Sequence, residues 1–240
     1  MYDTMIINID MIGVDMDKFI IEQSDENIMP LGGLPLAGYL LEITNLENRF
    51  NKVPIKGLKN TTKLENFEVI TSYLGLLLQG KNDFQNIEEY RGDIFFSEAL
   101  GINKVPSASR LRQRLDMMPI IMTELIKEES CKLLNKNKVK LGTCIDEFIP
   151  LDIDVSPFDN SNSQKEEIGY TYKKFMGYAP IFAYVGQDEG YLVNLELRNG
   201  KQHCQKNTPE FLKKVFSIQK KLPNLLFVYA WIQVMIHQII

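Results

Sequence analysis

The chain has 240 residues, of which 45% are hydrophobic and 24% are charged. This composition is typical of a globular protein of one or two domains and excludes a disordered, collagen-like or coiled-coil chain. The formal net charge of -4 argues against a nucleic-acid binder only globally, because residues 104–140 carry nine Lys and Arg against four Asp and Glu, whereas residues 1–30 carry one Lys against seven acids.

The cysteines and the N-terminal segment bear on the cellular compartment. Cys131, Cys144 and Cys204 are too few and too scattered for a disulfide framework or a zinc site with paired spacings. The N-terminal segment has no basic region before an apolar run, and no apolar stretch reaches the roughly 18 residues of a membrane span. We therefore expect a cytoplasmic protein.

The first part of the chain is predicted to be helical. Residues 1–30 are an acidic, loosely patterned strand or loop, closed by a Pro-Leu-Gly-Gly turn. Beyond it, apolar residues at helical spacing predict a helix over residues 34–50. Further helical segments are predicted over residues 67–78, 84–90 and 94–100, each followed closely by a glycine.

A basic helix follows residue 106. Ser107 is its predicted N-cap, and Leu111 and Leu115, four residues apart, are expected to face a core. The arginines of this helix are then expected on its flanks, in contact with solvent: Arg110, Arg112 and Arg114. Another helix is predicted over residues 119–135, and the polar run after it places a domain boundary near residue 138.

The hydrophobic period changes beyond this boundary. Residues 142–156 are predicted to form a β-strand in which Asp152 and Asp154 share one face, opposite an apolar face. Two acids in this arrangement are the oxygen ligands that hold a divalent cation, and such cations stabilise phosphoryl chemistry. The alternative from the pattern alone is the solvated face of an edge strand.

The remaining elements predict a meander followed by a helix. After a polar loop over residues 159–165, two strands are predicted over residues 178–185 and 191–197, with a turn between them. Consecutive strands are linked too briefly for a helical crossover. A helix is predicted from Thr208, its cap, to about residue 221, and a fourth strand over residues 225–232.

Several spaced motifs in this region resemble one family. The runs LDIDVSPFDNSNSQKE, YKKFMGYAPIFAYVG and GYLVNLELRNGKQHCQKNTPEFL resemble the front half of the catalytic domain of DDE-type bacterial insertion-sequence transposases, which has a ribonuclease-H-like fold. Upstream, GGLPLAGYLLEITNLENRF and VPSASRLRQRLD resemble the N-terminal helical region of that family. The resemblance implies an α+β chain, with a mainly helical DNA-binding region over residues 1–138 and a partial ribonuclease-H-like domain over residues 139–240.

The resemblance also implies roles for particular residues. The family cuts and joins DNA with two metal ions, Mg²⁺ or Mn²⁺, held by three carboxylates, the first in a pattern of Asp, any residue, then Ser or Thr. Here that pattern is Asp154-Val155-Ser156, with Asp152 as the second choice. The resemblance implies that the arginine helix binds the terminal inverted repeats of double-stranded DNA, in a complex that contains a homodimer of the chain. Lys173 and Lys174 lie where contacts to DNA phosphates would be useful.

Milder interpretations stand beside these roles. The arginines and the two lysines could be solvated surface residues, while Gly177 could serve a close backbone approach, Tyr178 the core and His203 a hydrogen-bonded turn. The string LDIDVS also resembles the Asp-x-Asp motif of haloacid-dehalogenase-type phosphatases, with Asp152 phosphorylated and Asp154 as acid and base. That fold needs parallel strands with crossovers, which the predicted meander lacks. A third interpretation is a DNA-binding fragment that does not cut.

The last nineteen residues, 222–240, contain no acid, although the family places its second carboxylate on the fourth strand. We expect a frameshift there. Read from the third base of each codon, the junction of Trp231 and Ile232 must spell an Asp codon, as must the junction of Met235 and Ile236, because Trp and Met have single codons and every Ile codon begins with AT. The chain would then be a truncated, inactive copy without its second and third carboxylates.

Overall fold

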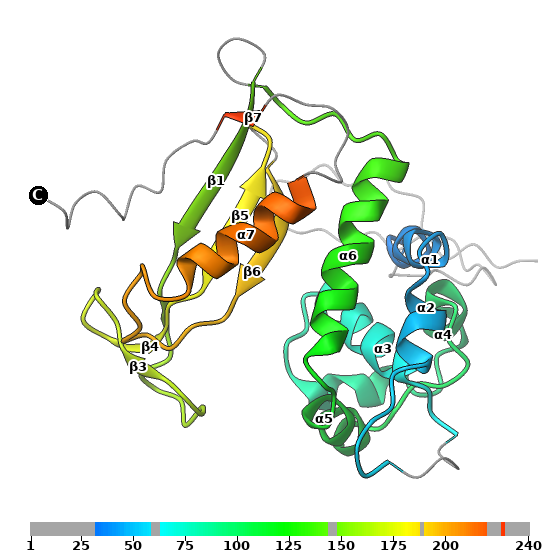
Figure 1. Ribbon diagram of the computed structural model, residues 1–240. Coiled ribbons are helices and arrows are strands. Elements are labelled where there is room, and N and C mark those ends of the chain that lie inside the picture. Colours follow the sequence, from blue (N-terminus) through cyan, green and yellow to red (C-terminus); the bar gives the residue numbers. More distant parts are fainter. Residues whose placement is uncertain (1–31, 59–62, 144–147, 188–189, 220–226, 229–240) are drawn as a thin grey trace, which may run out of the picture.

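A computed structural model describes residues 32–58, 63–143, 148–187, 190–219 and 227–228. A helical region and a sheet region lie side by side, and α6 is the helix of the helical region that lies nearest to the sheet (Figure 1). The helical region consists of α1 Leu34–Glu42, α2 Leu46–Asn51, α3 Asn66–Leu78, the 3₁₀ helix η1 Phe84–Tyr90, α4 Ile94–Leu100, α5 Ala108–Asp116 and α6 Ile121–Lys136. The predicted all-helical first part is therefore confirmed for the described residues.

Local signals in the sequence set the ends of these helices. Glu65 and Glu68 form a reciprocal capping box at the start of α3, and the side chain of Asp93 accepts a hydrogen bond from the backbone N–H of Phe96 at the start of α4. Gly101 ends α4 with φ of 65°, a left-handed conformation that glycine adopts without steric cost. No helix in the described ranges is long and apolar enough to cross a membrane.

The prediction of a single helix over residues 34–50 is wrong, because the helix is interrupted between α1 and α2. Thr44 Oγ1 donates to the carbonyl of Leu41 at 2.6 Å, which caps the end of α1. The backbone N–H of Asn45 then donates to Glu129 Oε2 on α6 at 3.3 Å. The break is fixed by a residue more than eighty positions away, so the local apolar spacing could not reveal it.

The sheet region contains a four-stranded sheet in the order β6-β5-β1-β7. Its strands are β1 Ile149–Val155, β5 Ile181–Val185, β6 Tyr191–Glu196 and β7 Phe227–Val228. β1 pairs antiparallel with β5, β5 antiparallel with β6, and β7 runs parallel to β1 after the helix α7 Thr208–Gln219. The predicted meander is confirmed, and β7 lies where the fourth strand was predicted.

One face of this sheet is buried under helices. α7 crosses the sheet in Figure 1, and its side chains Phe211 and Val215 join Ile149, Leu151 and Ile153 of β1 in one hydrophobic cluster. The order of strands, with three antiparallel strands followed by a helix and a parallel strand beside the first, is the order of a ribonuclease-H-like sheet. The chain is therefore α+β.

The residues between β1 and β5 in the sequence form a second, small sheet, which was not predicted. It contains β2 Phe158–Asp159, β4 Met176–Tyr178 and β3 Gly169–Tyr170, in that order. The strand predicted over residues 178–185 is accordingly two strands, separated at Pro180, which has no N–H for a continuous ladder. The strand predicted over residues 142–156 is described only from Ile149, since residues 144–147 are outside the described ranges.

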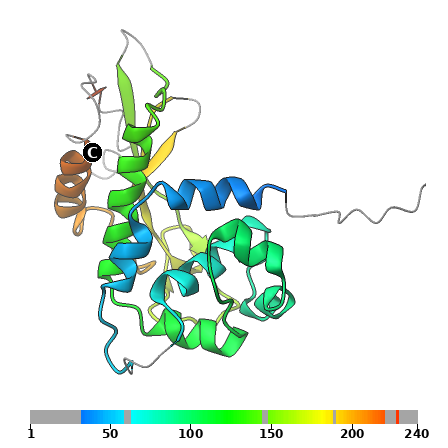
Figure 2. The same cartoon turned by 90° about the vertical axis from the view of Figure 1, so that its right-hand side faces the viewer.

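α6 contacts both regions. In Figure 2 it runs upright, with α7 to its left and most of the N-terminal helices to its right. Its Glu129 pairs with Arg49 of α2 at 2.5 Å, whereas Leu134 near its end packs against the cluster under the sheet. The domain boundary near residue 138 stays a prediction. The predicted strand or loop over residues 1–30 and the acid-free tail beyond residue 228 lie outside the described residues.

Candidate active site

The central strand β1 presents two carboxylates on one face. Asp152 and Asp154 are exposed, while Leu151, Ile153 and Val155 between and beside them are buried. Alternate residues of a strand point to the same face, and their Cα atoms lie about 6–7 Å apart. The alternation predicted from the sequence is confirmed, and both carboxylates face away from α7.

Two hydroxyl groups lie close to Asp154. Ser156 Oγ donates to Asp154 Oδ2 at 3.0 Å, as the Asp-x-Ser spacing allows. The hydroxyl of Tyr172 donates to the carbonyl oxygen of Val155 at 3.3 Å. Burial raises the pKa of Tyr172, and the negative charge of Asp154 raises it further. Tyr172 is a site residue that the sequence analysis missed.

Aromatic side chains flank the two carboxylates on the same face. Phe182 lies opposite Asp154 in the antiparallel register, and Tyr184 lies opposite Asp152. The ring of Phe182 contacts those of Phe158 and Tyr184, with centroids 5.9 and 6.1 Å apart. Strand alternation around the buried Ala183 could have placed Phe182 and Tyr184 on one face, but the pairing register needed the structure.

The charges around the two carboxylates favour a cation. Among the described residues, no lysine or arginine forms an ion pair with Asp152 or Asp154. Two like charges on one face therefore repel each other without local compensation, which a divalent cation would supply. The described part of the chain contains no group of three or more His, Cys, Asp or Glu side chains that could hold a metal ion. The two aspartates thus fit Mg²⁺ or Mn²⁺ as a partial set of oxygen donors.

The two candidate lysines lie on the turn next to Tyr172. Lys173 and Lys174 are exposed between β3 and β4, and Lys174 adopts a φ of 66° in the turn. The backbone N–H of Lys174 donates to the carbonyl of Thr171 at 2.9 Å, which closes the turn. The hydrogen bond of Tyr172 to Val155 attaches the turn that carries both lysines to the end of β1.

The three arginines of α5 do not share one environment. Arg110 and Arg112 are exposed, as predicted. Arg110 Nη1 donates to Gln113 Oε1 at 2.9 Å, and the guanidinium of Arg112 lies 5.4 Å from the ring centroid of Phe84. Arg114, in contrast, is 0% exposed. The expectation that all three arginines meet solvent is wrong for Arg114.

The buried Arg114 anchors the segment that precedes α3. Its Nη1 donates to the carbonyl of Leu64 at 2.8 Å and its Nη2 to Asn66 Oδ1 at 2.5 Å. Burial lowers the pKa of Arg114, and the positive charge of Arg110 lowers it further. Arg114 follows the buried Leu111 by three residues and so lies on the same helical face, a spacing that could have indicated its burial.

The remaining motif residues have structural roles. A Cβ atom on Gly177 would lie 1.9 Å from the carbonyl oxygen of Phe158, so the close backbone approach is confirmed. The hydroxyl of Tyr178 donates to the carbonyl of Glu166, and His203 Nδ1 accepts from the backbone N–H of Gln205 at 3.3 Å. The antiparallel pairing of β1 and β5 disagrees with the phosphatase alternative, whose sheet is parallel.

The basic helix and the acidic strand belong to different regions. α5 lies in the helical region, at the lower end of α6 in Figure 1, and β1 lies in the sheet region. A single small ligand therefore does not account for both groups of residues.

Comparison with known proteins bears on this arrangement. A family model described as a transposase DDE domain of group 1 matches residues 28–230. The match covers most of the chain, including α5 and β1, and it confirms the resemblance drawn from the motifs. A comparison with curated proteins and a comparison with solved structures each gave no match.

Proposed function

Because the chain belongs to the family of transposases with a DDE domain of group 1, we propose that it binds the terminal inverted repeats of a bacterial insertion sequence and carries the first of the carboxylates with which intact members of the family cut and join DNA. The observation that carries this proposal is the exposed pair Asp152 and Asp154 on one face of β1. Exposed acids on a central strand of this sheet, without a cationic partner among the described residues, are suited to cation binding.

Asp154 is the principal metal ligand in this proposal, and Asp152 assists it. Asp154 accepts the hydrogen bond of Ser156, which orients its carboxylate and leaves its second oxygen available. A bound Mg²⁺ or Mn²⁺ would supply charge stabilisation for an in-line displacement at a phosphodiester. Tyr172 would hold the β3–β4 turn near the end of β1, the strand that carries the two aspartates.

Double-stranded DNA is the proposed partner of the basic residues. Arg110 and Arg112 project from α5 into solvent, where guanidinium groups can contact phosphates and release counterions. Lys173 and Lys174 would contact phosphates nearer to β1. Two transposon ends brought together by two copies of the chain would form the proposed homodimeric complex.

The metal assignment is tested by Mn²⁺ titration of the full chain, followed by paramagnetic broadening of NMR signals. Wild-type protein should show broadening centred on β1. Asp154→Asn should raise the Mn²⁺ concentration needed for the same broadening at least tenfold. Asp116→Asn, which removes an equal charge from α5, is the matched control and should respond as the wild type does. Equal responses of all three proteins would remove Asp154 from the site.

The DNA assignment is tested by fluorescence anisotropy with a labelled duplex. Affinity should fall steeply with salt, and the double variant Arg110→Gln/Arg112→Gln should reduce both the affinity and the salt dependence without changing the unfolding temperature. An unaltered affinity would make these arginines solvated surface residues. DNA binding together with no Mn²⁺ site would favour the second candidate, a DNA-binding protein that does not cut, which the two-acid donor set also permits.

A further inference from the structure

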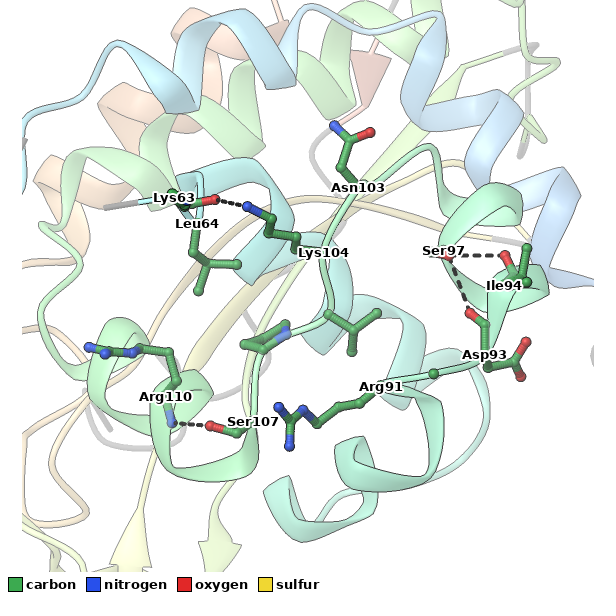
Figure 3. A pocket seen from close by; sticks show the side chains of 13 residues that line it. Lys63, Leu64, Arg91, Asp93, Ile94, Ser97, Asn103, Lys104, Ser107 and Arg110 are labelled. Atoms are coloured by element: carbon green, nitrogen blue, oxygen red, sulfur yellow. Dashed lines mark hydrogen bonds between the residues drawn. The ribbon is translucent and has the colours of Figure 1, made fainter. Parts of the chain in front are cut away.

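A pocket of about 520 Å³ opens in the helical region, on the surface between η1, α4 and α5 (Figure 3). Its size is within the range of ligand-binding pockets. Four cationic side chains line it, each from a different segment: Lys63 before α3, Arg91 after η1, Lys104 after α4 and Arg110 on α5. The sequence analysis singled out only Arg110 among them.

The charges of this pocket are unbalanced. Among the described residues of the lining, Asp93 is the one acid, and its Oδ1 accepts a hydrogen bond from the backbone N–H of Phe96 at 3.1 Å. Arg91 pairs with Glu88 at 3.0 Å in an exposed geometry that contributes little stability. In the described ranges, Lys63, Lys104 and Arg110 form no ion pair. The lining therefore has a surplus of positive charge. The N-terminus of α5 does not add to it, because Glu88 accepts a hydrogen bond from the backbone N–H of Ala108 there at 2.7 Å.

One wall of the pocket is held in place from two sides. Lys104 Nζ donates to the carbonyl of Lys63 at 3.1 Å, and the buried Arg114 donates to the carbonyl of the next residue, Leu64, at 2.8 Å. Two consecutive carbonyls are thus fixed by two cations, one lining the pocket and one behind it. A wall held in this way needs little reorganisation when a ligand binds. Arg114 is accordingly a positioning residue for this pocket.

We propose that this pocket binds a phosphate group of the DNA backbone. Four residues with guanidinium or ammonium groups, from four segments, line the cavity, and such groups recognise phosphate by charge-assisted hydrogen bonds. Ser97, Asn103 and Ser107 add polar side chains to the lining. The inference rests on the DNA binding proposed above and adds to it a specific site, with Lys63, Arg91 and Lys104 as contacts that do not read base sequence.

The first arm of the test measures duplex binding by the full chain over a range of NaCl concentrations. Lys63→Gln is the cleanest variant, because no hydrogen bond or ion pair is described for its side chain. Loss of one phosphate contact should reduce the slope of log K against log salt by about 0.9. Lys104→Gln should act in the same direction, whereas the matched control Lys56→Gln, an exposed lysine outside the lining, should leave the slope unchanged.

The second arm uses inorganic phosphate as the probe, without DNA. Titration at constant ionic strength, with sodium chloride as the balancing salt, should shift the backbone amide signals of Ser97, Asn103 and Ser107. The double variant Lys63→Gln/Lys104→Gln should lose these shifts, and Lys56→Gln should retain them. The thermal unfolding midpoint of each variant shows whether the fold is intact.

The outcomes separate this inference from the function on which it rests. Reduced slopes for Lys63→Gln and Lys104→Gln, with phosphate shifts at the pocket, support it. Phosphate shifts with unchanged slopes mean that the pocket takes free phosphate, which overturns the assignment to DNA. Salt-dependent DNA binding with neither effect overturns the pocket and leaves the proposed function in place. No duplex binding by the wild-type chain overturns both.

Discussion

The helical region and the central strand β1 differ in the burial of their charged residues. The helical region buries Arg114 and Glu129, whereas β1 leaves Asp152 and Asp154 exposed. Residues two apart in a strand always share a face, so one exposed aspartate predicts the other. Residues two apart in a helix lie about 200° apart around its axis, so Arg112 cannot share a face with Arg110 and Arg114. Arg110 and Arg114 lie only about 40° apart, so the packing of neighbouring segments decides that one is exposed and the other buried. Equal spacing therefore has different meanings in the two regions.

The strongest test of this contrast is the replacement of Arg114. Arg114→Ala should lower the free energy of unfolding by roughly 3–5 kcal/mol, because it leaves a cavity and the buried acceptors of Leu64 and Asn66 without a donor. Arg112→Ala, on the exposed side of the same helix, should cost less than about 1 kcal/mol, including its contact with Phe84. Urea denaturation measures both. Similar losses would mean that α5 has no buried arginine.

In the sheet region, the position expected to be sensitive to substitution is a closely packed glycine rather than a buried charged residue. Gly177→Ala should destabilise the protein by about 1–3 kcal/mol, because the added Cβ would meet the carbonyl oxygen of Phe158 at 1.9 Å. Gly92→Ala is the matched control in the helical region, since nothing lies within 4 Å of its added Cβ. Thermal unfolding of the two variants compares them, and a tolerated Gly177→Ala would contradict the close pairing of β2 and β4.

The buried Glu129 of the helical region should make the free energy of unfolding depend on pH. Burial pushes the pKa of Glu129 up, but hydrogen bonds from Lys132, Arg49 and the backbone N–H of Asn45 outweigh it and hold the pKa below the ordinary 4.5. Its contribution is therefore present above pH 4.5 and is lost as the pH falls through the lowered pKa of the folded state. Glu129→Gln should cost roughly 1–2 kcal/mol at pH 7.

The measurement is urea unfolding of wild type and Glu129→Gln from pH 7 down to pH 3. The difference between the two proteins should shrink as the pH falls below 4.5. A difference that stays constant over this range would show that the charge of Glu129 does not stabilise the fold. Asp116→Asn, at an exposed position of α5, should show no such convergence.

The smallest expected effect concerns the ion pair between the two regions. Lys214 on α7 lies 3.6 Å from Glu124 on α6, and both side chains are substantially exposed. Lys214→Ala should change the free energy of unfolding by less than about 0.5 kcal/mol, because solvent and salt screen such a pair. Calorimetry at low and high salt measures it. A larger loss would indicate that this pair, rather than the apolar contacts of α6, holds the regions together.

Elements with their own end signals were predictable from the sequence. Ser107 caps α5 as predicted, accepting from the backbone N–H of Arg110 at 3.4 Å, and Gly101 ends α4. The break between α1 and α2 was not predictable, because Glu129 contacts the backbone of Asn45 from a distant helix. The small sheet of β2, β3 and β4 was also missed, since strands of two or three residues leave almost no periodic signal.

The sequence by itself determined the α+β class, the meander, the exposed pair Asp152 and Asp154 and the family resemblance. These follow from local periods and ordered motifs, which need no knowledge of distant neighbours. Only the tertiary structure decided which arginine is buried, that Tyr172 lies beside Asp154 and that four distant cations line one pocket. Burial and electrostatic environment depend on which segments meet in space, and a linear pattern does not contain that information.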